Sequence, residues 1–314
     1  MVIRPVDHGI FASSAAGGPV GVAGYFAGGY NTSFAKQSTV DKFAFPGDGR
    51  STLGTGLSAV RTSLAGMANS GVAGYFGGGN PSTATVDKFA FPGDGRSTLG
   101  TGLSSSRYYL AGMANSGVAG YFGGGYSLSD VVDKFAFPGD GRSTLGTGLS
   151  SARHSLAGMA NVAVAGYFGG GNTSGARVAT VDKFAFPGDG RSTLGTGLSA
   201  GFLAPGAMAS SGVAGYFGGG ENSGGSVITT VDKFAFPGDS RSTLGTGLSV
   251  ARRYLAGMAD SSVAGYFGGG EDGSGTMQTV VDKFAFPGDS RSVLGTGLSS
   301  VRGYLGGMAD SGVF

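Results

Sequence analysis

The 314-residue chain contains no cysteine and only two histidines, His8 and His154. The absence of cysteine excludes disulfide bridges, cysteine-based zinc sites and thiol nucleophiles. The two histidines stand at non-equivalent places, and neither has a second histidine with which it could share a metal. We therefore predict a protein without catalytic residues, without a cofactor and without a metal site.

Long hydrophobic runs and an excess of one charge are missing as well. No stretch of about 18 consecutive apolar residues occurs, so we expect no membrane insertion. Residues 1–18 lack the continuous apolar centre of a signal peptide, so we expect no cleaved leader. The 21 Lys and Arg residues nearly balance the 19 Asp and Glu residues, which leaves no strong basic field for nucleic acid.

Proline is scarce, with 10 residues, whereas glycine supplies 67. The glycines follow no Gly-X-Y period, so the chain is not collagen-like, and they must serve turns and close packing. The 22 Phe, 12 Tyr and 40% apolar residues can bury enough surface to offset the entropy of ordering, so we expect a folded core.

The chain repeats one unit six times. The sequence VAGYFGGG begins at residues 72, 118, 164, 213 and 263, and a near copy, VAGYFAGG, begins at residue 22. The tripeptide Asp-Lys-Phe begins at residues 41, 87, 133, 182, 232 and 282, which gives spacings of 46, 46, 49, 50 and 50 residues. All the variation in length falls between AGYFGGG and DKFAF, so one loop varies while the rest of the unit is constant.

Each unit is predicted to contain four short strands. In the third unit these are residues 107–116, 117–122, 131–137 and 142–150, with the turn sequence Pro-Gly-Asp-Gly at 138–141. No segment shows an apolar period of 3.6 residues over ten or more positions, so helices should be almost absent. Six four-stranded units predict an all-β fold, a six-bladed β-propeller.

The repeat resembles a kelch repeat. A unit contains YFGGG, a variable stretch, VDKFAF, a turn, a leucine and an arginine that opens the next unit, and the resemblance covers residues 20–314. The kelch family has a tryptophan where this chain has leucine, so the chain is a divergent, kelch-like propeller. The six leucines are Leu53, Leu99, Leu145, Leu194, Leu244 and Leu294.

The two ends of the chain predict how the ring closes. Residues 301–314 repeat a first strand, whereas residues 11–20 match that strand poorly. We therefore expect residues 302–312 to complete the blade built from residues 21–58, so that the propeller comprises residues 19–314 and residues 1–18 form an N-terminal arm. The alternative is that residues 11–20 complete this blade and the C-terminal strand is an overhang or the beginning of a seventh blade.

The repeated charges are best interpreted as structural. Asp87 with Lys88, and Asp94 with Arg96, recur in every unit, so they are expected to pair within or between blades. Exposed pairs of this kind contribute only about 0–1 kcal/mol each.

A partner-binding face is predicted where the variable loops meet the arginines that open the blades. The loops begin at Asn80, Tyr126, Asn172, Glu221 and Glu271, and the arginines are Arg61, Arg107, Arg153, Arg252 and Arg302. In the fifth unit Phe202 replaces the arginine and Pro205 enters the first strand, which therefore should be an inner or edge strand there. Phe202 with Leu203 is a candidate apolar contact for a partner.

Two functions follow as expectations. The near-identical repeats resemble kelch-like tracts in structural proteins of marine bacteriophages, which implies a non-enzymatic virion component, such as a tail-fibre, baseplate or capsid-associated protein. Its partner would be a host-surface glycan or another virion protein. The alternative is a cytoplasmic kelch-type adaptor that binds an acidic peptide on the arginine-ringed face.

Overall fold

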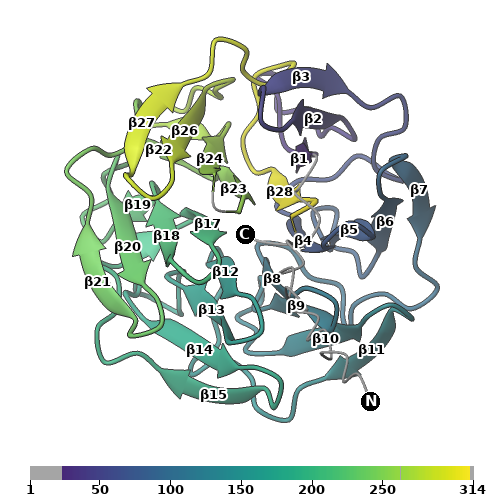
Figure 1. The fold of residues 1–314 in the computed structure, drawn as a ribbon, viewed down its shortest axis with the longest axis horizontal. Coiled ribbons are helices and arrows are strands. Elements are labelled where there is room, and N and C mark those ends of the chain that lie inside the picture. The colour runs from purple at the N-terminus through teal and green to yellow at the C-terminus, as the bar shows by residue number, and fades with distance from the viewer. Residues whose placement is uncertain (1–22, 262, 312–314) are drawn as a thin grey trace, which may run out of the picture.

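The computed structural model of the chain describes residues 23–261 and 263–311. These residues form 28 β-strands and no helix, and the long strands are arranged as six antiparallel four-stranded sheets around one axis (Figure 1). The prediction of an all-β, six-bladed propeller is confirmed. Within the described ranges no helix is long and apolar enough to span a bilayer.

The strands of each blade follow one another from the axis to the rim. In that order, blade 1 contains β28 (Gly306–Ala309), β1 (Ala23–Ala27), β2 (Val40–Ala44) and β3 (Gly49–Thr52). Blade 2 contains β4 (Ala65–Asn69), β5 (Ala73–Gly77), β6 (Val86–Ala90) and β7 (Gly95–Thr98). Blade 3 contains β8 (Ala111–Asn115), β9 (Ala119–Gly123), β10 (Val132–Ala136) and β11 (Gly141–Thr144).

The second half of the ring repeats this order. Blade 4 contains β12 (Ala157–Asn161), β13 (Ala165–Gly169), β14 (Val181–Ala185) and β15 (Gly190–Thr193). Blade 5 contains β17 (Gly206–Ser210), β18 (Ala214–Gly218), β20 (Val231–Ala235) and β21 (Ser240–Thr243). Blade 6 contains β23 (Ala256–Asp260), β24 (Ala264–Gly268), β26 (Val281–Ala285) and β27 (Ser290–Val293). Two short pairs lie outside these sheets: β16 (Phe202–Leu203) with β19 (Glu221–Asn222), and β22 (Arg252–Arg253) with β25 (Glu271–Asp272).

The ring is closed by the C-terminal strand. β28 pairs antiparallel with β1, with Met308 opposite Tyr25, and completes blade 1 as predicted. The alternative closure by residues 11–20 is wrong, because the two neighbours of β1 are β28 and β2. The predicted arm, residues 1–18, lies outside the described residues.

The four strands of blade 3 are shorter than the sequence predicts, and the first and fourth differ most. The first strand begins at Ala111 instead of residue 107, because Tyr109 takes a left-handed conformation with φ of 58° that interrupts the extended backbone. The fourth strand ends at Thr144 instead of residue 150. The chain after Thr144 instead crosses the base of the variable loop, where the backbone N–H of Leu149 donates to Asp130 O at 2.8 Å.

The core lies between neighbouring blades, and the repeated glycines make room for it. A Cβ at Gly120 would lie 2.2 Å from Sδ of Met67 in blade 2, and a Cβ at Gly123 would lie 2.8 Å from the ring of Phe168 in blade 4. A methionine of the preceding blade and a phenylalanine of the following blade therefore pack against each GYFG segment. The tight contact favours glycine at both places.

The Phe-Pro-Gly-Asp turn of each blade contacts the preceding blade through hydrogen bonds and ring stacking. Asp140 accepts hydrogen bonds from the Tyr75 hydroxyl at 2.7 Å and from Lys88 Nζ at 2.6 Å, and Phe137 stacks on Tyr75 at 5.4 Å between ring centroids. The same contacts join blade 6 to blade 1, where Asp48 accepts from Tyr266 and Lys283. The turn aspartate therefore pairs with the preceding blade's lysine.

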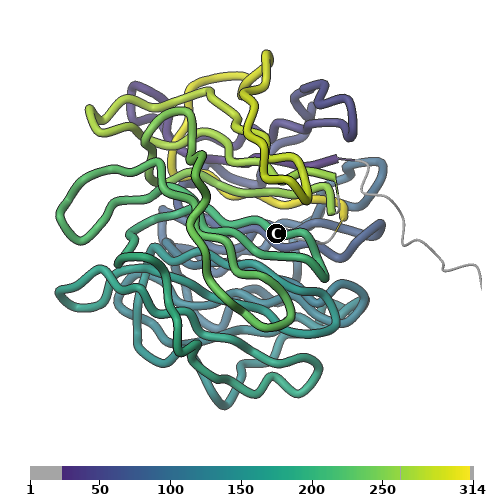
Figure 2. The backbone as a smooth tube through the Cα atoms, turned by 60° about the vertical axis from the view of Figure 1, so that its left-hand side comes forward, coloured from purple at the N-terminus to yellow at the C-terminus, as the bar shows by residue number. Residues whose placement is uncertain are grey.

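The two ends of the propeller differ in composition. One end, which we call the loop face, carries the variable loops between the second and third strands and the connections between blades. The other end, the hairpin face, carries the short turns between strands one and two and between strands three and four. Figure 2 shows the chain turned away from the axial view, with loops projecting on the left and on the right. The hairpin face exposes an equivalent valine in five blades: Val72, Val118, Val164, Val213 and Val263.

Candidate binding site on the loop face

The five arginines that open the blades are buried and do not form a binding surface. The Arg107 side chain is 2% exposed, and its Nη2 donates to Asp133 of the same blade at 2.5 Å. Its Nη1 donates to Gly124 O at 3.0 Å and to Val131 O at 2.9 Å, the two ends of the variable loop. Burial lowers the pKa of Arg107, and Asp133 opposes that shift. The predicted arginine-ringed face is therefore wrong, because these guanidinium groups hold the loops in place from inside.

Arg61, Arg252 and Arg302 repeat the whole arrangement, whereas Arg153 keeps the aspartate but donates to Phe168 O instead of the loop ends. Arg61 bonds to Asp87, Arg153 to Asp182, Arg252 to Asp282 and Arg302 to Asp41. Phe202, which replaces the arginine in blade 5, is 1% exposed and cannot offer a surface to a partner, so the expectation is wrong for Phe202. Leu203, the second residue of that predicted contact, is half-buried and lines a cleft on the loop face. Pro205 directly precedes β17, the innermost and hence edge strand of its sheet, as predicted.

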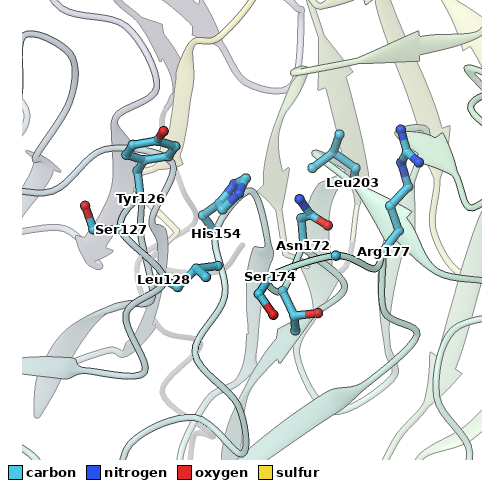
Figure 3. A pocket seen from close by; sticks show the side chains of 10 residues that line it. Tyr126, Ser127, Leu128, His154, Asn172, Ser174, Arg177 and Leu203 are labelled. Atoms are coloured by element: carbon cyan, nitrogen blue, oxygen red, sulfur yellow. The ribbon is translucent and has the colours of Figure 1, made fainter.

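A cleft of about 590 Å³ lies on the loop face between the variable loops of blades 3 and 4. Its lining combines rings, short polar side chains and one cation: Tyr126, Ser127, Leu128, His154, Asn172, Thr173, Ser174, Gly175, Arg177 and Leu203. Tyr126 and Arg177 lie at opposite ends, with His154 and Asn172 between them (Figure 3). The cleft thus brings together two of the residues predicted from the sequence, Tyr126 and Asn172.

Tyr126 offers an aromatic surface at one end of the cleft. Its side chain is 49% exposed, and its ring stacks on Tyr108 at 4.7 Å between centroids with an interplanar angle of 22°. His154 lies 5.6 Å from the Tyr126 ring, and burial lowers the pKa of its imidazole. At neutral pH, therefore, His154 adds an uncharged ring to this end of the cleft.

The other end of the cleft carries balanced charges. Arg177 pairs with Glu221, which also pairs with Arg253, and Arg253 donates to Glu271 at 2.7 Å. Glu271 accepts in turn from the Tyr304 hydroxyl at 2.9 Å. Burial alone would lower the pKa of Arg253, but its hydrogen bonds to Glu271 and Glu221 raise it. Glu221 and Glu271, both predicted as partner-binding residues, are buried members of this network.

Asn80, the remaining predicted residue, lies away from the cleft. Its side-chain oxygen accepts a hydrogen bond from Lys36 Nζ of blade 1 at 2.7 Å, and its backbone pairs with Thr62. Asn80 therefore joins the loops of blades 1 and 2.

A closed ring of backbone hydrogen bonds surrounds the axis on the loop face. Six residues, each two positions after the blade-opening residue, donate their N–H to the carbonyl of the equivalent residue in the preceding blade, at 2.6–3.0 Å. All six have φ between 54° and 61°, and three are tyrosines: Ser63, Tyr109, Ser155, Ala204, Tyr254 and Tyr304. Left-handed conformations are unusual for residues as large as tyrosine, and such outliers cluster at functional sites.

Sequence reasoning missed these tyrosines, together with Arg177 and His154 as cleft residues. The signal that could have found the tyrosines and His154 is the pair of residues that follows each blade-opening position, whereas Arg177 lies within the variable loop of blade 4. This pair is Thr-Ser, Tyr-Tyr, His-Ser, Leu-Ala, Arg-Tyr and Gly-Tyr around the ring, so it differs in every blade within an otherwise repeated segment.

No group of three or more His, Cys, Asp or Glu residues that could hold a metal occurs among the residues described. Comparison with known proteins finds neither a matching family model nor a matching curated protein.

Proposed function

We propose that this propeller is a non-enzymatic recognition module that binds a glycan in the cleft between the variable loops of blades 3 and 4. The observation that carries the proposal is the lining of that cleft, in which an exposed aromatic ring faces short polar side chains. A sugar presents an apolar face that stacks on a ring such as Tyr126, and hydroxyls that bond to amides and hydroxyls such as those of Asn172 and Ser174. The cleft volume of about 590 Å³ lies within the usual range for small-ligand sites.

The charges around the cleft favour a neutral sugar. Arg177 and Arg253 are matched by Glu221 and Glu271, and His154 is uncharged at neutral pH because burial lowers its pKa. An acidic peptide would need unpaired cations at the surface, and the five blade-opening arginines are buried. For that reason we do not propose the adaptor function.

We also propose that the module is part of a virion. This second proposal rests on the resemblance of its near-identical repeats to kelch-like tracts in structural proteins of marine bacteriophages. On this view one face is attached to other virion proteins and the loop face meets the host. Mass spectrometry of purified particles from the native source tests it, and absence of the chain from those particles contradicts it.

A glycan-array screen followed by titration calorimetry tests the binding proposal. We expect selective binding of a subset of neutral glycans and a loss of that binding in Tyr126→Ala. Val118→Ala is the matched control, because Val118 is similarly exposed but lies on the hairpin face of the same blade. Uniformly absent binding across the array, or equal weakening by the two substitutions, would contradict a glycan site in the cleft.

A further inference from the structure

Aromatic side chains form a continuous row across the loop face. From blade 1 the row passes from Phe34 to Tyr30 at 6.2 Å between centroids, and from Tyr30 to Tyr304 at 5.5 Å. At the axis, Tyr304 stacks on Tyr254 at 3.8 Å and lies 6.2 Å from Tyr109. We call these rings, together with Tyr108 and Tyr126, the aromatic row.

The row ends in the cleft. Tyr109 lies 5.1 Å from Tyr108, which stacks on Tyr126 at the cleft edge. Blade 1 stands across the ring from the cleft, which lies between blades 3 and 4 (Figure 1). The row therefore crosses the axis and joins the exposed Phe34, at 66% exposure, to the exposed Tyr126.

The fold fixes the backbone that carries the central rings. Tyr109, Tyr254 and Tyr304 are fixed at the backbone by the closed ring of hydrogen bonds around the axis. Their side chains leave only a cavity of about 60 Å³ beneath them, so they cover the axial mouth as a half-buried floor. A ligand that lies on such a preformed floor needs little ordering of the protein on binding.

None of these rings belongs to the repeated framework of the blades. At the places of Tyr109, Tyr254 and Tyr304 the other three blades carry Ser63, Ser155 and Ala204. The framework thus folds with a small residue at this position, and the tyrosines are not needed for the ring of hydrogen bonds itself.

We propose that the loop face binds a linear, neutral polysaccharide, which occupies the cleft with one segment and lies along the aromatic row toward Phe34. This inference rests on the proposed glycan function of the cleft and adds the length and the direction of the ligand. A row of rings suits a repeating ligand, because successive units of the chain can contact successive aromatic side chains. The rings differ in orientation, from edge-to-face at Tyr30 to stacked at Tyr254 and Tyr304, so some of these contacts would be with ring edges. Single-stranded nucleic acid also stacks on aromatic rows, but it needs basic groups for its phosphates, and the arginines beside the row are already paired with Glu221 and Glu271.

Calorimetric titration with oligosaccharides of increasing length tests the inference. The probes are the glucose, mannose and N-acetylglucosamine series from the monosaccharide to the octasaccharide. We expect the affinity for one series to rise with length beyond the disaccharide. Phe34→Ala should weaken binding of the longest members by about two- to tenfold, the effect of one lost aromatic contact, and leave the shortest members unchanged. Tyr126→Ala should weaken all members.

The outcomes separate this inference from the proposed function. If the affinity does not depend on the length of the oligosaccharide, or if Phe34→Ala weakens binding equally at every length, the extended site along the aromatic row is overturned. A glycan site in the cleft would remain. Binding to none of the series at any length overturns the extended site along the row, and absent binding across the glycan array overturns the site in the cleft as well. If oligothymidylate binds more tightly than any of the oligosaccharides, with an affinity that falls as salt is added, the row is a binding site for single-stranded nucleic acid instead. Phe34 is largely exposed, so a thermal unfolding midpoint equal to that of the unmodified protein confirms that Phe34→Ala is folded.

Discussion

The last turn of each unit contains two glycines that should respond very differently to the same substitution. Gly148, in the sequence Leu-Gly-Thr-Gly-Leu, approaches the base of the variable loop so closely that an added Cβ would lie 2.2 Å from Asp130 O. Gly146, two residues earlier, has no atom within 4 Å of its Cβ position. Neither has a positive φ, so alanine is compatible with both backbones.

The cost of Gly148→Ala can be worked out from this contact. Cβ atoms essentially never approach another atom below 3.0 Å, so the segment around Gly148 and the loop must separate by at least 3.0 − 2.2 = 0.8 Å. The opposing atom is backbone, and it already accepts a hydrogen bond from Leu149 at 2.8 Å. Overpacking of this kind costs about 1–3 kcal/mol, which lowers the melting temperature of a chain this size by roughly 2–5 °C. Gly146→Ala should change stability by no more than about 0.5 kcal/mol.

Differential scanning calorimetry and urea unfolding of the two variants test this reasoning. Because Asp130 lies at the end of the loop that carries Tyr126, Gly148→Ala should also weaken glycan binding in the cleft, whereas Gly146→Ala should not. Equal stability of the two variants would refute the argument, since it would mean that the segment around Gly148 moves away from the loop at no cost.

Three further outcomes follow from the contacts within and between blades. Asp140→Ala leaves the buried Tyr75 hydroxyl without an acceptor and should cost about 1–3 kcal/mol in urea unfolding; an unchanged midpoint would show that the inter-blade contact is not needed. Arg107→Ala leaves Asp133 buried without its cation and should lower the free energy of unfolding by about 3–5 kcal/mol. Arg142→Ala, at a side chain that is 27% exposed, should lower it by less than about 1 kcal/mol. The six inter-blade tyrosines have raised pKa values, chiefly because they are buried and also because each donates to an aspartate. Above pH about 10 the unfolded chain releases phenolic protons that the folded chain keeps, so the stability of the fold should decrease as the pH rises. Phenolate absorbance from these six tyrosines should therefore appear only together with loss of the circular dichroism signal of the folded protein.

The fold could be predicted from the sequence because the same four-stranded unit is repeated six times. Asp-Lys-Phe, Tyr-Phe-Gly-Gly and the Phe-Pro-Gly-Asp turn recur with constant spacing, and the unmatched first strand at 302–312 identifies how the ring closes. Local pattern was less informative about strand ends. The left-handed residue at Tyr109 is set by the contacts around the axis, and those contacts join residues of different blades.

The site could be predicted only in part. Variation in length correctly indicated the loops that contain Tyr126 and Asn172, which line the cleft. The arginines led to a wrong expectation, because a charged residue repeated at the start of each blade is equally consistent with an exposed ring and with a buried ion pair. Only the structure shows that each aspartate of the Asp-Lys-Phe tripeptides in blades 1–4 and blade 6 lies opposite such an arginine and that neither partner is exposed.

The buried arginines explain how one framework can carry loops of different length. In blade 3, Arg107 donates to Gly124 O and Val131 O, which are 131 − 124 = 7 residues apart. In blade 1, Arg302 makes the same two bonds to Gly28 O and Thr39 O, which are 39 − 28 = 11 residues apart. One guanidinium group thus holds the two ends of the loop in blades 1, 2, 3 and 6. In blade 4, Arg153 bonds to Phe168 O and Asp182 instead, and blade 5 has Phe202 in this place. Because these guanidinium groups contact only backbone carbonyls in the loop, the loop sequence can change without altering the bonds. The loops of blades 1 and 3, which carry Phe34 and Tyr126, can therefore differ while the blades stay nearly identical.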